Sequence, residues 1–238
     1  MKLIIATIAL CTQLFMNSAT AAGLELHSHA FMKHGMGPLL RGDFHSPTKS
    51  TSWKSLLATN LNEETLIESD IDVFVVSLYA VPVVSLVNGG MRTAIRKQIQ
   101  EAKDFVKDHP EWHLAKNATE AWRLYQQGKK IMIFSLEGAG GILNNEADLD
   151  EFITEHGIAI VTPIHLTDSR FGGAAYMRGF RKTFFTTKLF SPKKVDGVKI
   201  NFRGATKKGK WLVEELIKRG AWVDLTHSSD LFQKDILP

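Results

Sequence analysis

The stretch KIMIFSLEG, residues 130–138, decides the fold class of this chain. Its apolar run, Ile131–Leu136, predicts a buried strand, and the run ends in the carboxyl group of Glu137. A carboxylate is costly to bury unless it is paired or bound to a metal, and the glycines from Gly138 onward let backbone come close to a ligand. The alternative interpretation is a glutamate that caps the next helix. The first interpretation predicts a functional site at the carboxyl end of this strand.

Histidines follow three other segments that the sequence predicts as strands. They are His27 and His29 after Leu24–Leu26, His165 after Ile158–Ile164, and His227 after Ala221–Thr226. A parallel sheet that closes into a barrel collects the carboxyl ends of its strands on one face, so these side chains would converge on a shared pocket. Imidazole and carboxylate groups are ligands for zinc. The pattern predicts a metal-assisted hydrolase site.

Helices alternate with strands along the chain. Besides the strands above, the sequence predicts a strand at Ile71–Tyr79 and helices at Leu61–Glu68, at Met91–Lys107, from Asn117 to Gly128, around Leu149–Ile153, and from Thr206 to Gly220. Alternation of this kind favours a parallel α/β sheet, either as a barrel or open. Residues Arg170–Arg203 mix glycines, aromatic residues and positive charge without a clean period, which predicts a long loop or insertion over the site.

The N-terminus has the three parts of a secretory signal. A charged start is followed by an apolar run and by small residues, with Ala19-x-Ala21 as the expected cleavage site. The apolar run is shorter than the roughly 20 residues of a membrane span, so we expect no stable span. We therefore expect residues 1–21 to be a signal peptide, residues 22–238 to be a single metallohydrolase domain, and the protein to be periplasmic or extracellular. The only cysteine, Cys11, lies in the signal, so disulfides and cysteine-based sites are excluded from the exported chain.

Composition and charge are those of an ordinary globular domain. The 238 residues are 44% hydrophobic and 23% charged, with a formal net charge of +4. Positive charge is densest between Arg178 and Lys210, but no stacking-aromatic or recognition-helix pattern accompanies it. The sequence therefore predicts a basic surface and no nucleic-acid partner.

The candidate ligands differ in how specific their patterns are. A His-x-His pair such as His27 and His29 is a weak motif alone, but both imidazoles of a strand's i and i+2 positions can face one metal. His165 or His227 alone would more often be a hydrogen-bonded core histidine. The set is harder to ascribe to chance, because all of its members lie at strand ends. The remaining histidines are expected at the surface; they are His34, His45, His109, His113 and His156.

The ordered motifs resemble a known family. Glu137-Gly138 after its strand, His165 in TPIH (residues 162–165), and DLTH (residues 224–227) after the helix that Thr206 opens look like the membrane (renal) dipeptidase family of the amidohydrolase superfamily. The resemblance implies a TIM-type (β/α)8 barrel with two zinc ions, and hydrolysis of small peptides or related amides by a metal-activated hydroxide. It implies that His27 and His29 hold the first metal, Glu137 bridges both, His227 holds the second, and His165 contacts the substrate carbonyl. A homodimer is left open.

The chain departs from the family pattern in two ways. Position 29 is usually aspartate in the family, and histidine there removes one negative charge from the site. The family also continues beyond the equivalent of Pro238 into a further metal histidine and a proton-transferring aspartate, and only five or six strand–helix units are expected here instead of eight. We therefore expect a C-terminally truncated, incomplete barrel. Two alternatives stay open: a catalytically impaired remnant that binds a metal or ligand, and a lactonase- or phosphotriesterase-like enzyme, which the pair at 27 and 29 suggests and Glu137 in place of a bridging lysine disfavours.

Overall fold

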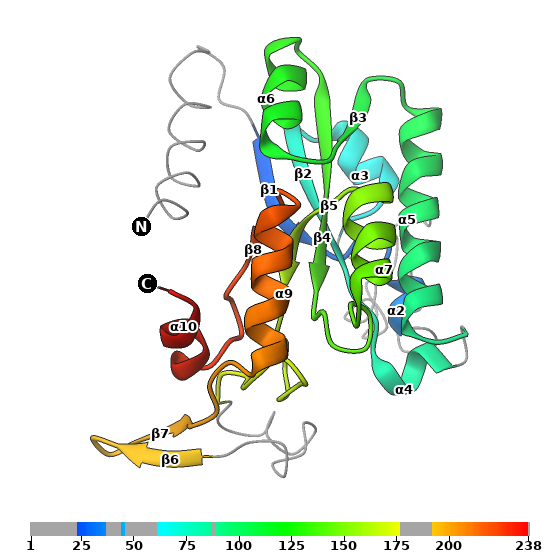
Figure 1. Ribbon diagram of the computed structural model, residues 1–238. Helices are drawn as coiled ribbons and strands as arrows, with labels where there is room; N and C mark the ends of the chain where they lie inside the picture. The colour runs from blue at the N-terminus through cyan, green and yellow to red at the C-terminus, as the bar shows by residue number, and fades with distance from the viewer. Residues whose placement is uncertain (1–22, 37–43, 46–60, 87–88, 177–191, 238) are drawn as a thin grey trace. The chain divides into compact units, whose positions relative to one another are not determined.

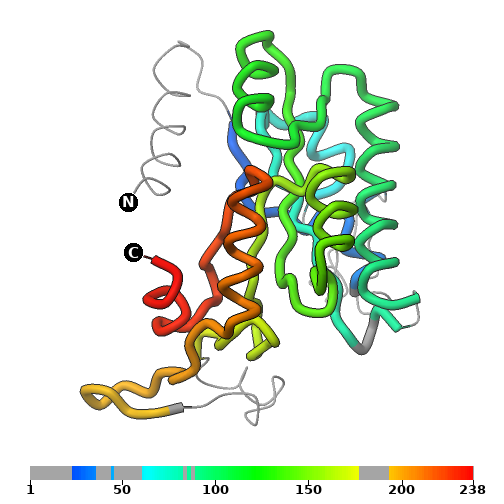
Figure 2. Tube along the Cα trace, in the orientation of Figure 1, coloured from blue at the N-terminus to red at the C-terminus, as the bar shows by residue number. Residues whose placement is uncertain are grey.

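The computed structural model is a mixed α/β fold with a mostly parallel main sheet (Figure 1). It describes residues 23–36, 44–45, 61–86, 89–176 and 192–237, which Figure 2 traces in colour. The chain divides into two compact units, Met1–Ser135 and Leu136–Pro238. The expected signal peptide lies outside the described residues, so export stays a prediction.

The described residues of the N-terminal unit form four strands in parallel pairings. Strand β1 (Gly23–Ser28) pairs with β2 (Ile71–Leu78), and β3 (Trp112–Ala115) pairs with β4 (Lys130–Glu137), which ends in the C-terminal unit. Residues 73–78 and 131–137 are buried without interruption, as the near-continuous apolar sequence of both strands requires. The strands predicted at Ile71–Tyr79 and Lys130–Leu136 are confirmed.

Five helices lie in the part of this unit that the structure describes. They are α2 (Lys33–Met36), α3 (Glu63–Glu68), α4 (Pro82–Ser85), α5 (Met91–Asp108) and α6 (Ala118–Gln126). Helix α5 buries one apolar stripe against β2 and β3. Helix α6 begins at Asn117, whose side chain accepts a hydrogen bond from the Glu120 backbone N–H at 2.9 Å, and Gly128 follows its end with φ of 69°.

Aromatic side chains form the centre of this unit's core. Phe44 lies 4.5 Å from Phe31 and 5.2 Å from Phe105 between ring centroids, and Trp112 lies 6.0 Å from Phe105. All four are buried. Tilted and edge-on aromatic pairs at these separations stabilise beyond the area they bury, by about 0.5–1.5 kcal/mol each.

The C-terminal unit combines a parallel strand pair with helices and a hairpin. Its elements are α7 (Glu146–Leu149), the π-helix η4 (Asp150–Glu155), β5 (Ile158–Thr162), β6 (Pro192–Val195), β7 (Val198–Asn201), α9 (Lys207–Lys218), β8 (Trp222–Val223) and α10 (Asp230–Ile236). Strand β5 pairs in parallel with β8, on which α9 packs. Thr206 caps α9 by accepting a hydrogen bond from the Gly209 backbone N–H, as its position in the sequence predicts.

Two sequence-based expectations are corrected in the C-terminal unit. The strand predicted at Ala221–Thr226 is only two residues long, because Asp224 turns its side chain back to the Thr226 backbone N–H and ends the pairing. The described part of Arg170–Arg203 is not all irregular: β6 and β7 form an antiparallel hairpin. Its turn, Asp196-Gly197, has φ of 48° and 78°, and an Asp-Gly pair between valines is a strong hairpin signal that the sequence-based prediction missed.

Candidate metal centre

Glu137 is the last residue of β4, and its position is fixed by the residues that follow it. The backbone N–H groups of Gly138 and Ala139 both donate to the Thr162 carbonyl, at 3.0 and 3.1 Å, which ties the end of β4 to the end of β5. The Glu137 side chain is only 5% exposed. A carboxylate at this depth requires a positive partner.

His165 follows β5 and approaches the backbone of Gly138 closely. Gly138 has φ of 86°, and a Cβ added there would lie 3.1 Å from the His165 Cβ. Only glycine meets both conditions without strain. The sequence predicted that Gly138 lets the backbone come close to a bound ligand. In the structure it lets the backbone come close to the His165 side chain.

His227 follows β8 in the left-handed region of backbone space, with φ of 65°. Asp224 holds this turn beside β5: its backbone N–H donates to the Val161 carbonyl at 2.9 Å, and its Oδ2 accepts from the Thr162 hydroxyl at 2.9 Å. Histidine is among the non-glycine residues that adopt this region most often, yet the conformation is uncommon and clusters at functional sites.

These three side chains converge on one carboxylate oxygen. Glu137 Oε1 lies 3.2 Å from His165 Nε2 and 3.2 Å from His227 Nε2. The two imidazole rings meet edge to face, with centroids 4.7 Å apart. One ligand atom from each residue lies within 4.8 Å of the other two. We call Glu137, His165 and His227 the triad.

The triad is electrostatically suited to a cation. The hydrogen bond with the Glu137 carboxylate raises the pKa of His227 above its ordinary value, and partial burial opposes this shift without cancelling it. The negative charges of Glu137 and Asp224 add to the rise. The same negative charges would attract a metal ion.

The spacing of the triad also fits a metal. Two ligand atoms on a tetrahedral zinc ion, each about 2.0–2.2 Å from it, lie about 3.3 Å apart. The two separations of 3.2 Å from Glu137 Oε1 agree with this value. Imidazole nitrogen and carboxylate oxygen are both zinc ligands, so Glu137 and His227 fit the ion that the motifs predict, with His165 beside them.

His27 and His29 form a second pair of nitrogen donors, in the N-terminal unit. Their Nε2 atoms lie 3.2 Å apart, and their ring centroids are 4.9 Å apart. His29 Nδ1 lies 3.1 Å from the Ser77 carbonyl oxygen, which can only accept, so Nδ1 carries the proton and Nε2 presents its lone pair toward His27. Metal-bound histidines are commonly oriented by such a carbonyl.

The structure therefore brings the predicted site residues together in two groups, the triad and the pair. The roles predicted for the individual residues, including the bridging role of Glu137, stay predictions. Two contributors were missed: Gly138 as the residue that admits His165, and the Thr162–Asp224 hydrogen bond. The aspartate of that hydrogen bond is part of the DLTH motif, three residues before His227. Four of the histidines expected at the surface, His34, His45, His109 and His156, lie near acidic side chains.

Comparison with known proteins supports the fold. No protein-family model and no curated protein matches the sequence. Dipeptidase AC, a metallo-peptidase of family M19, is similar with a TM-score of 0.63 and 15% identity, over 91% of this chain and 60% of that chain. A metallo-peptidase from Rhodobacter sphaeroides was solved with a phosphinate mimic of the dipeptide L-Ala-D-Ala. It is similar with a TM-score of 0.62 and 15% identity, over 91% of this chain and 62% of that chain. The probable dipeptidase PvdM from Pseudomonas aeruginosa is similar with a TM-score of 0.57 and 15% identity, over 87% of this chain and 51% of that chain.

This chain has the fold of these metallo-dipeptidases. The predicted mixed α/β fold with a mostly parallel sheet is confirmed, and the similar structures are TIM-barrel dipeptidases. Because the identity is only 15%, the likeness concerns the fold. The chain spans about three fifths of the length of the first two structures.

Proposed function

We propose that this protein is a zinc-dependent hydrolase that cleaves dipeptides or related amides. The observation that supports this most directly is the buried Glu137 oxygen at 3.2 Å from two imidazole nitrogens. The metallo-dipeptidase fold supports the same conclusion independently of the side chains. No helix among the described residues is long and apolar enough to cross a bilayer. Export and a homodimer stay predictions.

The residues of the triad have distinct roles in this proposal. His227 and Glu137 would hold a zinc ion, and their close contact keeps both side chains in place before it binds. When bound, zinc would polarise a carbonyl and lower the pKa of water. His165, 15% exposed, would donate a hydrogen bond to the oxyanion that forms from the substrate carbonyl.

The pair His27 and His29 would hold a further zinc ion. The pair offers two imidazole nitrogens 3.2 Å apart, and the Ser77 carbonyl orients the His29 ring through Nδ1. Neutral imidazole also suits copper, iron and nickel, so the identity of the metal is part of the proposal.

Metal removal and a substrate panel test the function. The purified chain is freed of metal with a chelator, and hydrolysis of alanine-containing dipeptides and of a simple lactone is measured before and after zinc is restored. We expect dipeptide hydrolysis to be lost on chelation, recovered with zinc, and absent in Glu137→Gln. The matched control is Glu214→Gln, an exposed glutamate of α9, which should retain full activity.

The other outcomes separate the alternatives. Zinc binding without hydrolysis of either substrate would replace the enzyme with a metal-binding protein. Zinc-dependent lactone hydrolysis with inert dipeptides would instead assign the lactonase class. Dipeptide hydrolysis that survives complete metal removal would overturn the proposal.

A further inference from the structure

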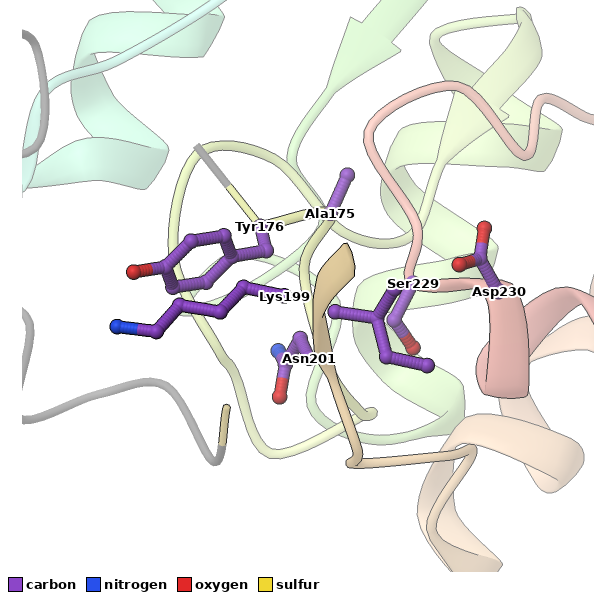
Figure 3. Close-up of a pocket in the computed structure, with 7 residues that line it drawn as sticks. Ala175, Tyr176, Lys199, Asn201, Ser229 and Asp230 are labelled. Atoms are coloured by element: carbon purple, nitrogen blue, oxygen red, sulfur yellow. The ribbon is translucent and has the colours of Figure 1, made fainter. Parts of the chain in front are cut away.

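A polar pocket lies in the C-terminal unit. A pocket of about 180 Å³ is lined by residues from three segments: Ala175 and Tyr176, the β7 residues Lys199, Ile200 and Asn201, and Ser229 and Asp230 at the start of α10. In Figure 3 the side chains of Tyr176 and Lys199 extend in the same direction, while the Asp230 carboxylate lies on the other side of the pocket. The volume is about that of six water molecules, at roughly 30 Å³ each, which is enough for a small organic ion.

The walls of this pocket are fixed by a buried hydrogen-bond network. Asp168, whose side chain is 2% exposed, accepts from the Asn201 side-chain amide at 2.6 Å and from the Ala174 backbone N–H at 2.9 Å. The Asn201 amide also donates to the Ala174 carbonyl at 2.7 Å. Strand β7 is thereby held against the segment that carries Tyr176, so the pocket is preorganised.

The third segment that lines the pocket, which contains Ser229 and Asp230, is held by hydrogen bonds to the same part of the backbone. The Ser229 hydroxyl donates to the Arg203 carbonyl at 2.6 Å and accepts from the Phe232 backbone N–H, which caps α10. The Ala175 backbone N–H donates to the His227 carbonyl at 2.6 Å. The pocket and the turn that bears His227 therefore share one hydrogen-bonded backbone.

The two charged residues that line the pocket, Lys199 and Asp230, lie on opposite sides of it, so the Lys199 side is the positive one. Lys199 faces Lys194 directly across the hairpin, and like charges at opposed positions of an antiparallel pair are destabilising. Among the described residues, no acidic side chain forms an ion pair with Lys199. Asp230 lies in the first turn of α10, where a carboxylate is stabilised by the helix itself.

We propose that this pocket binds the carboxylate of a small organic acid, with the Lys199 ammonium as the charged donor and the Tyr176 hydroxyl beside it. A single ammonium balances one negative charge, so the site suits a monoanion better than a phosphate dianion. The proposal concerns binding and does not depend on hydrolysis at the triad.

Equilibrium binding of a matched ligand pair tests the site. N-acetylglycine, N-acetylglycinamide and inorganic phosphate are titrated into the full chain and followed by NMR chemical shifts. We expect N-acetylglycine to bind at least about tenfold more tightly than its neutral amide, and Lys199→Met to lose about tenfold in affinity, since a hydrogen bond to a charged group is worth that much. Tyr176→Phe should lose less.

Two variants test whether the ligand is held by Lys199 and not by the general charge of the hairpin or by the triad. Lys193 extends to the other face of the same hairpin, over the Phe202 ring at 4.3 Å, so Lys193→Met should bind N-acetylglycine as the wild type does. Glu137→Gln, which alters the triad, should also leave this binding unchanged. The proposal is overturned if the amide or phosphate binds as tightly as N-acetylglycine, if Lys193→Met loses as much as Lys199→Met, or if binding disappears with Glu137→Gln and persists with Lys199→Met.

Discussion

Two glutamates of this chain each lie between two histidines, but they use their oxygens differently. Glu63 places Oε2 2.7 Å from His45 Nδ1 and Oε1 2.9 Å from His109 Nε2, so each imidazole has its own oxygen. Its side chain is 31% exposed. Distances of 2.7–2.9 Å between nitrogen and oxygen are typical of charge-assisted hydrogen bonds, so a proton on each imidazole nitrogen accounts for both contacts.

Glu137 brings two imidazoles to a single oxygen. The separations of 3.2 Å are longer than those around Glu63, and the side chain is 5% exposed. Such spacing is close to the roughly 3.3 Å between neighbouring ligands of a tetrahedral zinc ion. The comparison teaches that composition alone does not identify a metal site: convergence on one oxygen, ligand spacing and burial distinguish Glu137 from Glu63.

The largest expected difference between the two glutamates is in zinc affinity. Glu137→Gln removes a direct ligand. Loss of a residue that only hydrogen-bonds to a metal ligand already lowers metal affinity about 10- to 100-fold, so we expect Glu137→Gln to lower zinc affinity by about 100-fold or more. Glu63→Gln should leave zinc affinity unchanged. Competition with a chromophoric chelator measures both constants. Equal losses in the two variants would remove the distinction between the two sites.

The two histidines of the triad should separate binding from catalysis. Because His227 is proposed as a ligand and His165 as an oxyanion donor, His227→Ala should lose zinc, while His165→Ala should keep zinc and lose about 100-fold in kcat. Zinc content and steady-state kinetics of both variants are the measurement. A loss of zinc in His165→Ala as large as in His227→Ala would make His165 a ligand.

Gly138→Ala tests the close approach of His165 to the triad. Alanine at a φ of 86° costs about 1–2 kcal/mol, and its Cβ would also press on His165. The matched control is Gly128→Ala, which has φ of 69° but no atom within 4 Å of the added Cβ. Both variants should lower the free energy of unfolding, Gly138→Ala by more, and only Gly138→Ala should lower kcat, because the contact displaces His165. Equal effects on stability with an unchanged kcat would show that the contact is unimportant.

The pH dependence of zinc binding follows from the pKa of His227. Zinc requires the neutral imidazole, and the Glu137 carboxylate raises this pKa above 6.5, so the proton competes at higher pH than it would at an ordinary histidine. Zinc affinity should therefore fall with decreasing pH from above 6.5 onward. Chelator competition between pH 8 and 5 measures the profile. In Glu137→Gln the residual affinity should begin to fall at lower pH, and an unchanged profile would contradict the coupling.

The smallest expected effect is on stability at Glu63. Burial would raise the pKa of Glu63, but hydrogen bonds from His45 and His109 outweigh it and hold the pKa below 4.5. The contribution to folding is therefore present above the unfolded pKa and is lost as the pH falls through the folded pKa. Because the group is partly exposed, Glu63→Gln should cost less than about 1 kcal/mol at pH 7. Urea unfolding at pH 7 and pH 3 checks that the difference disappears in acid.

Much of the fold is predictable because long apolar runs and caps are local signals. Strand β4, the Asn117 cap of α6 and the Thr206 cap of α9 follow from the sequence. Strand β3 does not, since Trp112–Ala115 is four residues long with no alternation, and it forms through pairing with β4. Helix α10 was also missed, although Ser229 caps it.

The candidate site was predictable in its residue types and not in its geometry. Strand ends identify Glu137, His165 and His227, because parallel strands place their carboxyl ends at one edge. The approach of both imidazoles to the same Glu137 oxygen depends on the Gly138 turn and on the Thr162–Asp224 hydrogen bond. That hydrogen bond joins residues 62 positions apart in the sequence. The local sequences of Glu63 and Glu137 do not show that each glutamate will contact two histidines, nor that only Glu137 will offer both of them the same oxygen. These contacts join residues that are distant in the sequence.

Anomalous diffraction at the zinc edge tests the central claim most directly. In crystals grown with zinc, the account predicts a peak about 2.0–2.2 Å from both Glu137 Oε1 and His227 Nε2, and no peak at Glu63. A zinc-saturated crystal without a peak at Glu137, or with zinc between His45 and His109 instead, would contradict it.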